Sequence, residues 1–304
     1  MIKTSYITPL LCLLIAPLLL GIINRVKAYF AGRRGRPLLQ AYFDISKLLR
    51  KGIVYGKTTS AVFRFAPAAV LAGALLASFL MPWGGISAPA SFTGDFILFA
   101  YLMGATRFFT VLAALDTGSA FEGMGASREV QLAALGEPTL MLGMLLLAVQ
   151  TGETSLSEMV RAIQGEGWLN AHASFALLIV AWMILLLTEN SRIPVDDPNT
   201  HLELTMIHEV MVLDTGGPEL GLMTLAASVK LFLFSGLVAN LLVPFHPQSP
   251  ALQIAVFLSG VVITSAAVGV VESVMARLRL VRVPKLLIGS TAMVATALVM
   301  KLAS

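Results

Sequence analysis

The chain has 304 residues, of which 57% are apolar and only 12% are charged, and its mean hydropathy is +0.84. Soluble domains are about 45–50% apolar, so this composition excludes a soluble globular protein and indicates a protein that crosses a membrane several times. The net charge of +4 is not typical of a nucleic-acid-binding protein. The single cysteine, Cys12, excludes an internal disulfide. An iron–sulfur cluster needs about four thiolates, so this chain cannot hold one by itself.

Apolar segments long enough to cross ~30 Å of hydrocarbon, roughly 20 residues each, recur along the chain. We predict about eight transmembrane helices, at residues 4–24, 61–81, 96–115, 131–150, 170–188, 220–243, 251–272 and 285–303. The fold class is therefore an all-α polytopic membrane helix bundle, with residues 1–304 forming one membrane domain. The first segment is longer than the core of a signal peptide, and Arg25 and Lys27 follow it where a cleavage site needs small residues. We interpret it as a retained helix.

The distribution of Lys and Arg predicts the orientation. If residues 25–60 are cytoplasmic, 16 basic residues collect on that face and only Lys3, Arg161 and Lys301 on the other. Basic residues are retained on the cytoplasmic side of a membrane. The expected cytoplasmic segments are 25–60, 116–130, 189–219 and 273–284, and both termini are expected outside.

Residues 37–51 (PLLQAYFDISKLLRK) have the pattern of an amphipathic helix. Pro37 suits a first helical turn. The apolar side would consist of Leu38, Leu39, Tyr42, Phe43, Ile45, Leu48 and Leu49. Such a helix lies on the membrane surface. It would act either as an anchor or as a platform for a docked partner.

Several charges fall inside or at the ends of the apolar segments. Arg107 and Lys230 lie near the middle of the third and sixth, Glu137 lies in the fourth, Glu189 ends the fifth, and Glu272 is near the end of the seventh. A charge at the bilayer centre costs at least ~2.5–3.5 kcal/mol, so these side chains should face protein or water. They would form either a relay that carries protons into the membrane, in which Arg107 tunes its neighbours, or buried ion pairs that fix helix packing.

Two loops carry unusual residues. Phe121–Glu129 (FEGMGASRE) has a GxG pattern with no preceding strand and no following GK[ST], which favours a flexible turn over a phosphate site. In 189–219, the spacing predicts a helix from Thr200 to Asp214 that ends at Gly216-Gly217. Along that helix His201 and His208 would lie about 10 Å apart, too far to share one metal. Position 212 is Val, which excludes a zincin motif.

The segment ENSRIPVDDPNTHLELTMIHEVMVLD (Glu189–Asp214) resembles the signature of the respiratory complex I subunit 1 family. The quinone-dependent branch of that family has a pattern nearer E-x-x-R-x-P-F-D-L-P-E. Here Val195-Asp196-Asp197-Pro198 stands at the corresponding place, which is similar to the hydrogenase branch, the membrane subunits of formate hydrogenlyases and energy-converting [NiFe] hydrogenases. Further matches are Gly32–Lys51, Gly123–Glu129 and Glu137-Pro138, so the resemblance covers essentially the whole chain.

The resemblance implies a membrane anchor and coupling subunit, non-catalytic alone, within an oxidoreductase complex of a bacterial or archaeal cytoplasmic membrane. It implies that soluble subunits dock on the cytoplasmic face of this chain as a peripheral arm. The redox reaction of that arm is expected to be linked to proton or Na⁺ translocation through the membrane. The implied partners are the [NiFe] hydrogenase large and small subunits, a ferredoxin-like iron–sulfur subunit and antiporter-like membrane subunits. The iron–sulfur clusters and the Ni–Fe centre are expected in those partners, and no cofactor or metal is expected in this chain.

The candidate site residues form two sets. The proton relay or coupling set is Glu137, Glu189, Glu203, Glu209, Lys230 and Arg107. The set for the docking or former quinone-cavity surface is Arg34, Arg36, Asp44, Lys47, Glu122, Arg128, Glu129, Arg192, Asp196, Asp197, His201, His208 and Asp214. By resemblance, Asp196, Asp197 and His201 would line the cavity that holds quinone in complex I.

Three alternatives remain open. The chain would otherwise be a quinone-binding membrane subunit of a complex I-like dehydrogenase, or a purely structural anchor without ion coupling. A self-sufficient transporter around Lys230 and Arg107 is disfavoured because the sequence has no inverted repeat.

Overall fold

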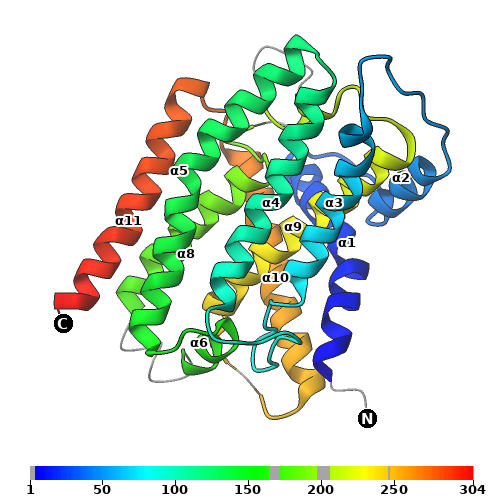
Figure 1. Ribbon diagram of the computed structural model, residues 1–304. Helices are drawn as coiled ribbons and strands as arrows, with labels where there is room; N and C mark the ends of the chain where they lie inside the picture. Colours follow the sequence, from blue (N-terminus) through cyan, green and yellow to red (C-terminus); the bar gives the residue numbers. More distant parts are fainter. Residues whose placement is uncertain (1–3, 164–171, 197–205, 246, 304) are drawn as a thin grey trace.

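A computed structural model describes residues 4–163, 172–196, 206–245 and 247–303, and within these residues it is all-helical (Figure 1). The helices are α1 (Thr8–Phe30), α2 (Gln40–Leu49), α3 (Ala61–Ser78), α4 (Asp95–Asp116), α5 (Ala120–Thr151), α6 (Leu156–Ala162), α8 (His172–Glu189), α9 (Gly217–Leu242), α10 (Pro250–Val274) and α11 (Val283–Ala303). Short 3-10 turns are η1 (Thr4–Ile7), η2 (Glu209–Val212) and η3 (Leu280–Arg282).

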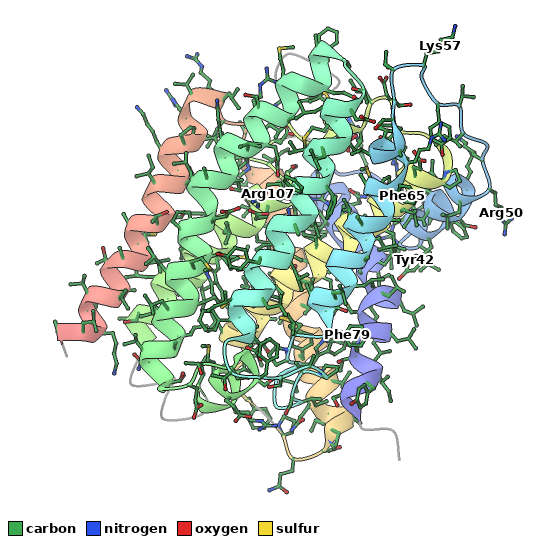
Figure 2. All side chains as sticks on the ribbon, in the orientation of Figure 1. Tyr42, Arg50, Lys57, Phe65, Phe79 and Arg107 are labelled. Atoms are coloured by element: carbon green, nitrogen blue, oxygen red, sulfur yellow. The ribbon has the colours of Figure 1, made fainter. Side chains whose placement is uncertain are left out.

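Seven of the described helices are long and apolar enough to cross a membrane: α1, α3, α4, α5, α9, α10 and α11, the last extended by η3. The remaining predicted span coincides with α8, whose apolar part, Ala173–Glu189, is shorter. All-helical membrane architecture is thus confirmed. Aliphatic side chains are compatible with contact to lipid. A helix forms all its backbone hydrogen bonds within itself, as the absence of water in the bilayer core requires. Phe65 on α3 (labelled in Figure 2) is 72% exposed, as expected of an apolar residue that faces lipid.

Helix α9 lies at the centre of the bundle. Its most apolar window is 72% buried, compared with 22–50% for the other six long helices. It packs against α1, α2, α3, α8 and α10. The indole of Trp83 stacks on Phe257 of α10 with ring centroids 4.9 Å apart and lies 5.3 Å from the ring of Phe232 of α9. A charge carried by α9 therefore has protein on most sides.

The two ends of the bundle differ (Figure 1). The start of α1, the end of α11 and the short helix α6 lie at one end. The other end carries α2, η2, the α4–α5 junction and the segments before α9 and α11. We call this the basic end and define it by residues 31–60, 117–119, 190–196, 206–216 and 275–282. The predicted amphipathic segment forms α2 there, against α1 and α9.

Two local predictions were wrong. Residues 121–129 are not a flexible turn, because α5 begins at Ala120 and includes them. Gly125 serves close packing: a Cβ there would lie 2.2 Å from Val210 Cγ1 and 2.9 Å from the Ile207 carbonyl oxygen. The helix expected up to Asp214 is, from Met206 onward, only the single turn η2. The part expected at residues 200–205 lies outside the described residues.

The reason for the second error is tertiary. The amides of Ile207 and His208 donate to the Asp196 carboxylate, at 3.0 and 3.4 Å, and not to helical carbonyls. A buried carboxylate that accepts backbone amides holds the chain in a non-helical path. The backbone conformation of this segment is therefore set by its contacts with Asp196 and not by the local spacing of its apolar residues.

Candidate functional site

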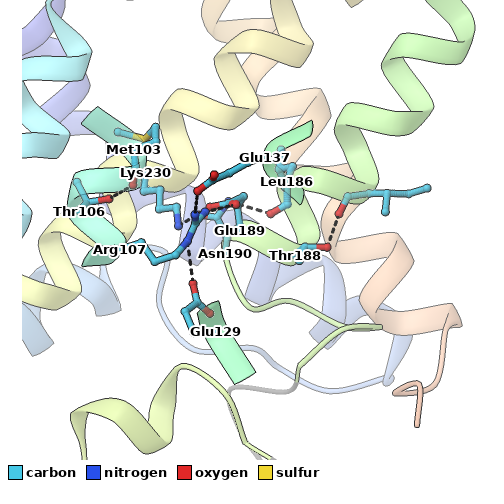
Figure 3. Close-up of polar contacts among 11 residues, drawn as sticks. Met103, Thr106, Arg107, Glu129, Glu137, Leu186, Thr188, Glu189, Asn190 and Lys230 are labelled. Carbon is cyan, nitrogen blue, oxygen red and sulfur yellow. Dashed lines mark hydrogen bonds and ion pairs between the residues drawn. The ribbon is translucent and has the colours of Figure 1, made fainter. Parts of the chain in front are cut away.

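Arg107 is the centre of an ion-pair network inside the bundle (Figure 3). Helix α4 holds it near its middle, and its side chain is only 7% exposed. Its Nε lies 3.3 Å from Glu129 Oε1, its Nη1 lies 2.7 Å from Glu137 Oε1, and its Nη2 pairs with Glu189 Oε1. One guanidinium thus joins α4 to α5 and to the end of α8.

Lys230 completes the network from α9. Its Nζ lies 2.7 Å from the second carboxylate oxygen of Glu189, so Glu189 binds two cations at once. We call Arg107, Glu129, Glu137, Glu189 and Lys230 the coupling cluster. Its formal charge is two positive and three negative, a net −1 if all groups are ionised. Buried charges persist where they are paired, and here each cation meets at least one carboxylate.

The three carboxylates of the coupling cluster differ sharply in exposure. The side chain of Glu189 is 6% exposed, that of Glu129 13%, and that of Glu137 57%. Glu137 therefore opens to the outer surface of α5, although it is bonded to the buried Arg107. The cluster extends from the interior of the bundle to its exposed surface at α5.

A cavity of about 420 Å³ lies beside the cluster. Apolar residues from α1, α3 and α9, including Leu20, Val70, Ala74 and Met223, form one part of its wall. Its charged lining residues are Arg36, Asp44, Arg107, Glu129, Glu189, Arg192, Glu209 and Lys230, with His208 beside them. The structure thus brings part of both candidate sets to one cavity, which reaches from α2 at the basic end to Lys230.

A second ion-pair network adjoins the cavity. Glu272, whose side chain is fully buried, lies 2.7 Å from Lys27 Nζ and 3.4 Å from Arg192 Nη1. It joins α1 and α10 to the segment that follows α8. In the sequence Glu272 and Arg192 stand out separately, and nothing there pairs Lys27 with either of them. A basic residue directly after an apolar span suggests only an interfacial anchor, so no signal in the sequence pointed to this partner.

Asp196 has a different place from the one expected. It is 1% exposed, pairs with Arg277 at 2.8 Å, and accepts the two backbone amides of the η2 segment. It is not among the residues that line the cavity. By resemblance Asp196 was expected to line a quinone-type cavity; here its carboxylate is occupied by Arg277 and by the Ile207 and His208 amides. Asp197, His201 and Glu203 lie outside the described residues.

The remaining docking candidates fall into two groups. Glu122, fully buried, accepts the Asp214 amide at 2.9 Å, and Arg128 Nη1 donates to the Met206 carbonyl at 2.8 Å. These contacts fasten the η2 segment to α5. Arg34 and Lys47 are exposed at the basic end. In the part of the chain that the structure describes, no three His, Cys, Asp or Glu side chains gather in a way that could hold a metal ion.

A multi-span helical bundle with a charged interior and an adjoining cavity defines a membrane protein with a polar site enclosed between its helices. The sequence matches the NADH dehydrogenase family model over residues 2–303, and the chain belongs to this family, that of complex I subunit 1. It is 32% identical over 252 residues to hydrogenase-4 component C of Escherichia coli K12, covering 83% of this chain and 78% of that protein. It is 30% identical over 279 residues to formate hydrogenlyase subunit 4 of the same strain, covering 90% and 89%.

The fold has a solved counterpart. A chain of the membrane-bound sulfane sulfur reductase, an archaeal respiratory membrane complex, superimposes with a TM-score of 0.85 at 22% identity, covering 98% of both chains. At this identity the likeness concerns the fold. The predicted family and its hydrogenase branch are confirmed by the sequence relatives.

Proposed function

We propose that this chain is the membrane anchor and coupling subunit of a complex I-like [NiFe] hydrogenase assembly. Its similarity to a hydrogenase component and to a formate hydrogenlyase subunit supports this assignment. The excess of Lys and Arg at the basic end supports an orientation in the cytoplasmic membrane with that end inside and both termini outside. Soluble hydrogenase and ferredoxin-like iron–sulfur subunits dock on the basic end, and those subunits hold the iron–sulfur clusters and the Ni–Fe centre.

The coupling cluster is the observation that carries the proposal. Glu189 faces the cavity and is held by both Arg107 and Lys230, while Glu137 opens to the membrane side and shares Arg107. Two unit charges 4 Å apart interact by roughly 4 kcal/mol at an effective dielectric constant near 20. A change of one pKa unit needs only about 1.36 kcal/mol. Moving one charge in this cluster therefore suffices to change whether a neighbouring carboxylate holds a proton.

The proposed mechanism follows from the shared guanidinium. A charge or conformational change in the docked arm alters the cavity wall near Arg192 and Glu209. The hold of Lys230 on Glu189 changes in response, and Arg107 redistributes its bonds among its three carboxylates. Glu137 then gains or loses its ion pair with Arg107 at the outer face of α5. An antiporter-like membrane subunit at that face responds by moving a proton or Na⁺.

The test uses the assembled complex in membranes, with Glu137→Gln and Glu189→Gln. We expect the complex to assemble in the Glu137→Gln variant and hydrogen turnover to lose its link to ion pumping. Glu158→Gln is the matched control, because Glu158 forms an exposed ion pair with Arg161 at the opposite end. If both variants keep turnover and pumping at wild-type levels, the chain is a structural anchor and the coupling proposal fails.

Quinone binding is a second candidate, favoured by one observation. The cavity combines apolar walls with a charged end, and about 420 Å³ lies within the size range of small-ligand pockets. Inhibition of the purified assembly by quinone analogues, or quinone that copurifies with it, would favour this candidate. Hydrogen turnover that such analogues do not inhibit would favour the hydrogenase-type coupling subunit over the quinone-binding one.

A further inference from the structure

A second hollow lies beside α2, apart from the charged cavity, and the two share no lining residue. It has a volume of about 380 Å³ and is framed by α1, α2 and α9. Its apolar wall includes Leu13, Leu14 and Pro17 of α1, Ile45 and Leu49 of α2, and Leu225 of α9. Leu14 and Leu49 are 55% and 46% exposed, so the groove is open to the surroundings of the bundle. Nothing in the coupling mechanism uses this groove.

The groove results from two contacts that hold α2 against α1 and α9. The Tyr42 hydroxyl donates to the Leu14 carbonyl and ties α2 to α1. On the other side, a Cβ at Gly221 would lie 3.3 Å from Leu48 Cβ, so α9 carries a glycine where α2 approaches closely. These two contacts set the spacing of the three helices and leave the hollow between them.

A polar stripe runs along one side of the groove. Tyr42, Ser46 and Arg50 are spaced by four residues, which places them on one face of α2, and all three line the groove. Arg50 is exposed and forms no ion pair with any acidic residue of the described chain. In Figure 2 it projects outward at the edge of the bundle, while Tyr42 lies nearer to α1. The groove thus has an apolar interior and an unneutralised guanidinium at its outer edge.

We propose that this groove binds an anionic phospholipid, with an acyl chain against Leu14, Pro17 and Leu225 and the phosphate on Arg50. An amphipathic helix lies at the boundary between headgroups and acyl chains, which is where such a lipid offers both parts. Guanidinium groups bind phosphate oxygens in a bidentate manner. Lys47 and Lys51 flank Arg50 in the sequence and add to the attraction for an anionic headgroup. The site does not depend on the proposed coupling function.

The test is lipid retention by the purified full-length chain, measured by native mass spectrometry after exchange into phosphatidylglycerol or phosphatidylcholine. We expect phosphatidylglycerol to remain bound in preference to phosphatidylcholine. Arg50→Gln should lower its retention by roughly fivefold, the order expected for one basic residue at an anionic surface. The control is Lys57→Gln, an exposed basic residue of the same basic end that does not line the groove (Figure 2).

The second variant tests the apolar part. Leu14→Trp places a larger side chain in the groove at an exposed position, so it should displace the lipid without unfolding α1. The proposal is overturned if Arg50→Gln and Lys57→Gln lower retention equally, which indicates only surface charge. It is also overturned if Arg50→Gln has no effect, or if the wild-type chain retains both lipids alike.

Discussion

The Lys230 ammonium lies 2.7 Å from one oxygen of Glu189, and the Arg107 guanidinium binds the other oxygen of the same carboxylate. A single carboxylate therefore joins the three helices α4, α8 and α9. The side chain of Glu189 is only 6% exposed. A carboxylate buried to this extent stays ionised only because the two cations pair with it.

We predict that Glu189→Gln destabilises the chain more than Lys230→Met. Removal of one partner of a buried pair costs about 3–5 kcal/mol, since it leaves an uncompensated charge. Glu189→Gln removes the one carboxylate that pairs with Lys230 among the described residues, whereas Lys230→Met leaves Glu189 still paired with Arg107. Thermal melting of the purified subunit gives the ranking. Glu158→Gln, in an exposed pair with Arg161, should change the stability by less than about 1 kcal/mol.

A second prediction concerns Asp196. Asp196→Asn removes the charge that accepts the Ile207 and His208 amides and pairs with Arg277. Hydrogen bonds to a charged group contribute about 1.5–3 kcal/mol each, so these two amides should exchange with solvent faster by at least tenfold. Hydrogen exchange with mass spectrometry measures this. Asp44→Asn, at an exposed position of α2, is the control, and equal exchange in both variants would contradict the role of Asp196.

Two glycines of α5 provide a matched pair for the packing of η2. Gly125→Ala should lower the melting temperature, because its Cβ would meet Val210 Cγ1 at 2.2 Å and backbone oxygen at 2.9 Å. Gly123→Ala has nothing within 4 Å of its Cβ and should stabilise the helix by about 0.5–1 kcal/mol. A similar loss of stability in both variants would mean that the glycines supply flexibility, as the sequence first indicated.

The last prediction concerns pH. The Tyr55 hydroxyl donates to Glu219 Oε1 at 2.6 Å, and this hydrogen bond raises the pKa of Tyr55 above its ordinary value of 10.0. The folded chain therefore keeps the phenolic proton at a pH where the unfolded chain loses it. The stabilisation is fully present below pH 10, the unfolded value, and is lost as the pH rises through the folded value.

Ultraviolet titration of tyrosinate formation, together with thermal melting above neutral pH, measures this effect. Tyr55→Phe should remove one high-pH ionisation and flatten the loss of stability above about pH 10. Tyr29→Phe is the control, because Tyr29 is 83% exposed on α1. If the ionisation that Tyr55→Phe removes lies at pH 10 or below, the hydrogen bond to Glu219 is contradicted.

Individual residues show where sequence reasoning succeeded and failed. Arg107 and Lys230 stood out because a charge within an apolar run is visible without any structure. The sequence also placed Glu137 and Glu189 in the same set, but it did not show which charges pair, since Arg107 reaches Glu137 and Glu189 from 30 and 82 residues away along the chain. Lys27 was missed because its partner Glu272 lies on α10. Residues 121–129 were assigned to a turn because their glycines suggested flexibility, whereas Gly125 is required for contact with η2.

The sequence by itself determined the membrane class, the succession of apolar helices, the amphipathic α2 and the family, because these depend on composition, local periodicity and local motifs. Only the tertiary structure decided which charges meet, that Asp196 accepts the Ile207 and His208 amides, and that α1, α2 and α9 enclose a separate groove. Ion pairs and cavities arise between helices that are distant in the chain, and their geometry depends on how the helices pack.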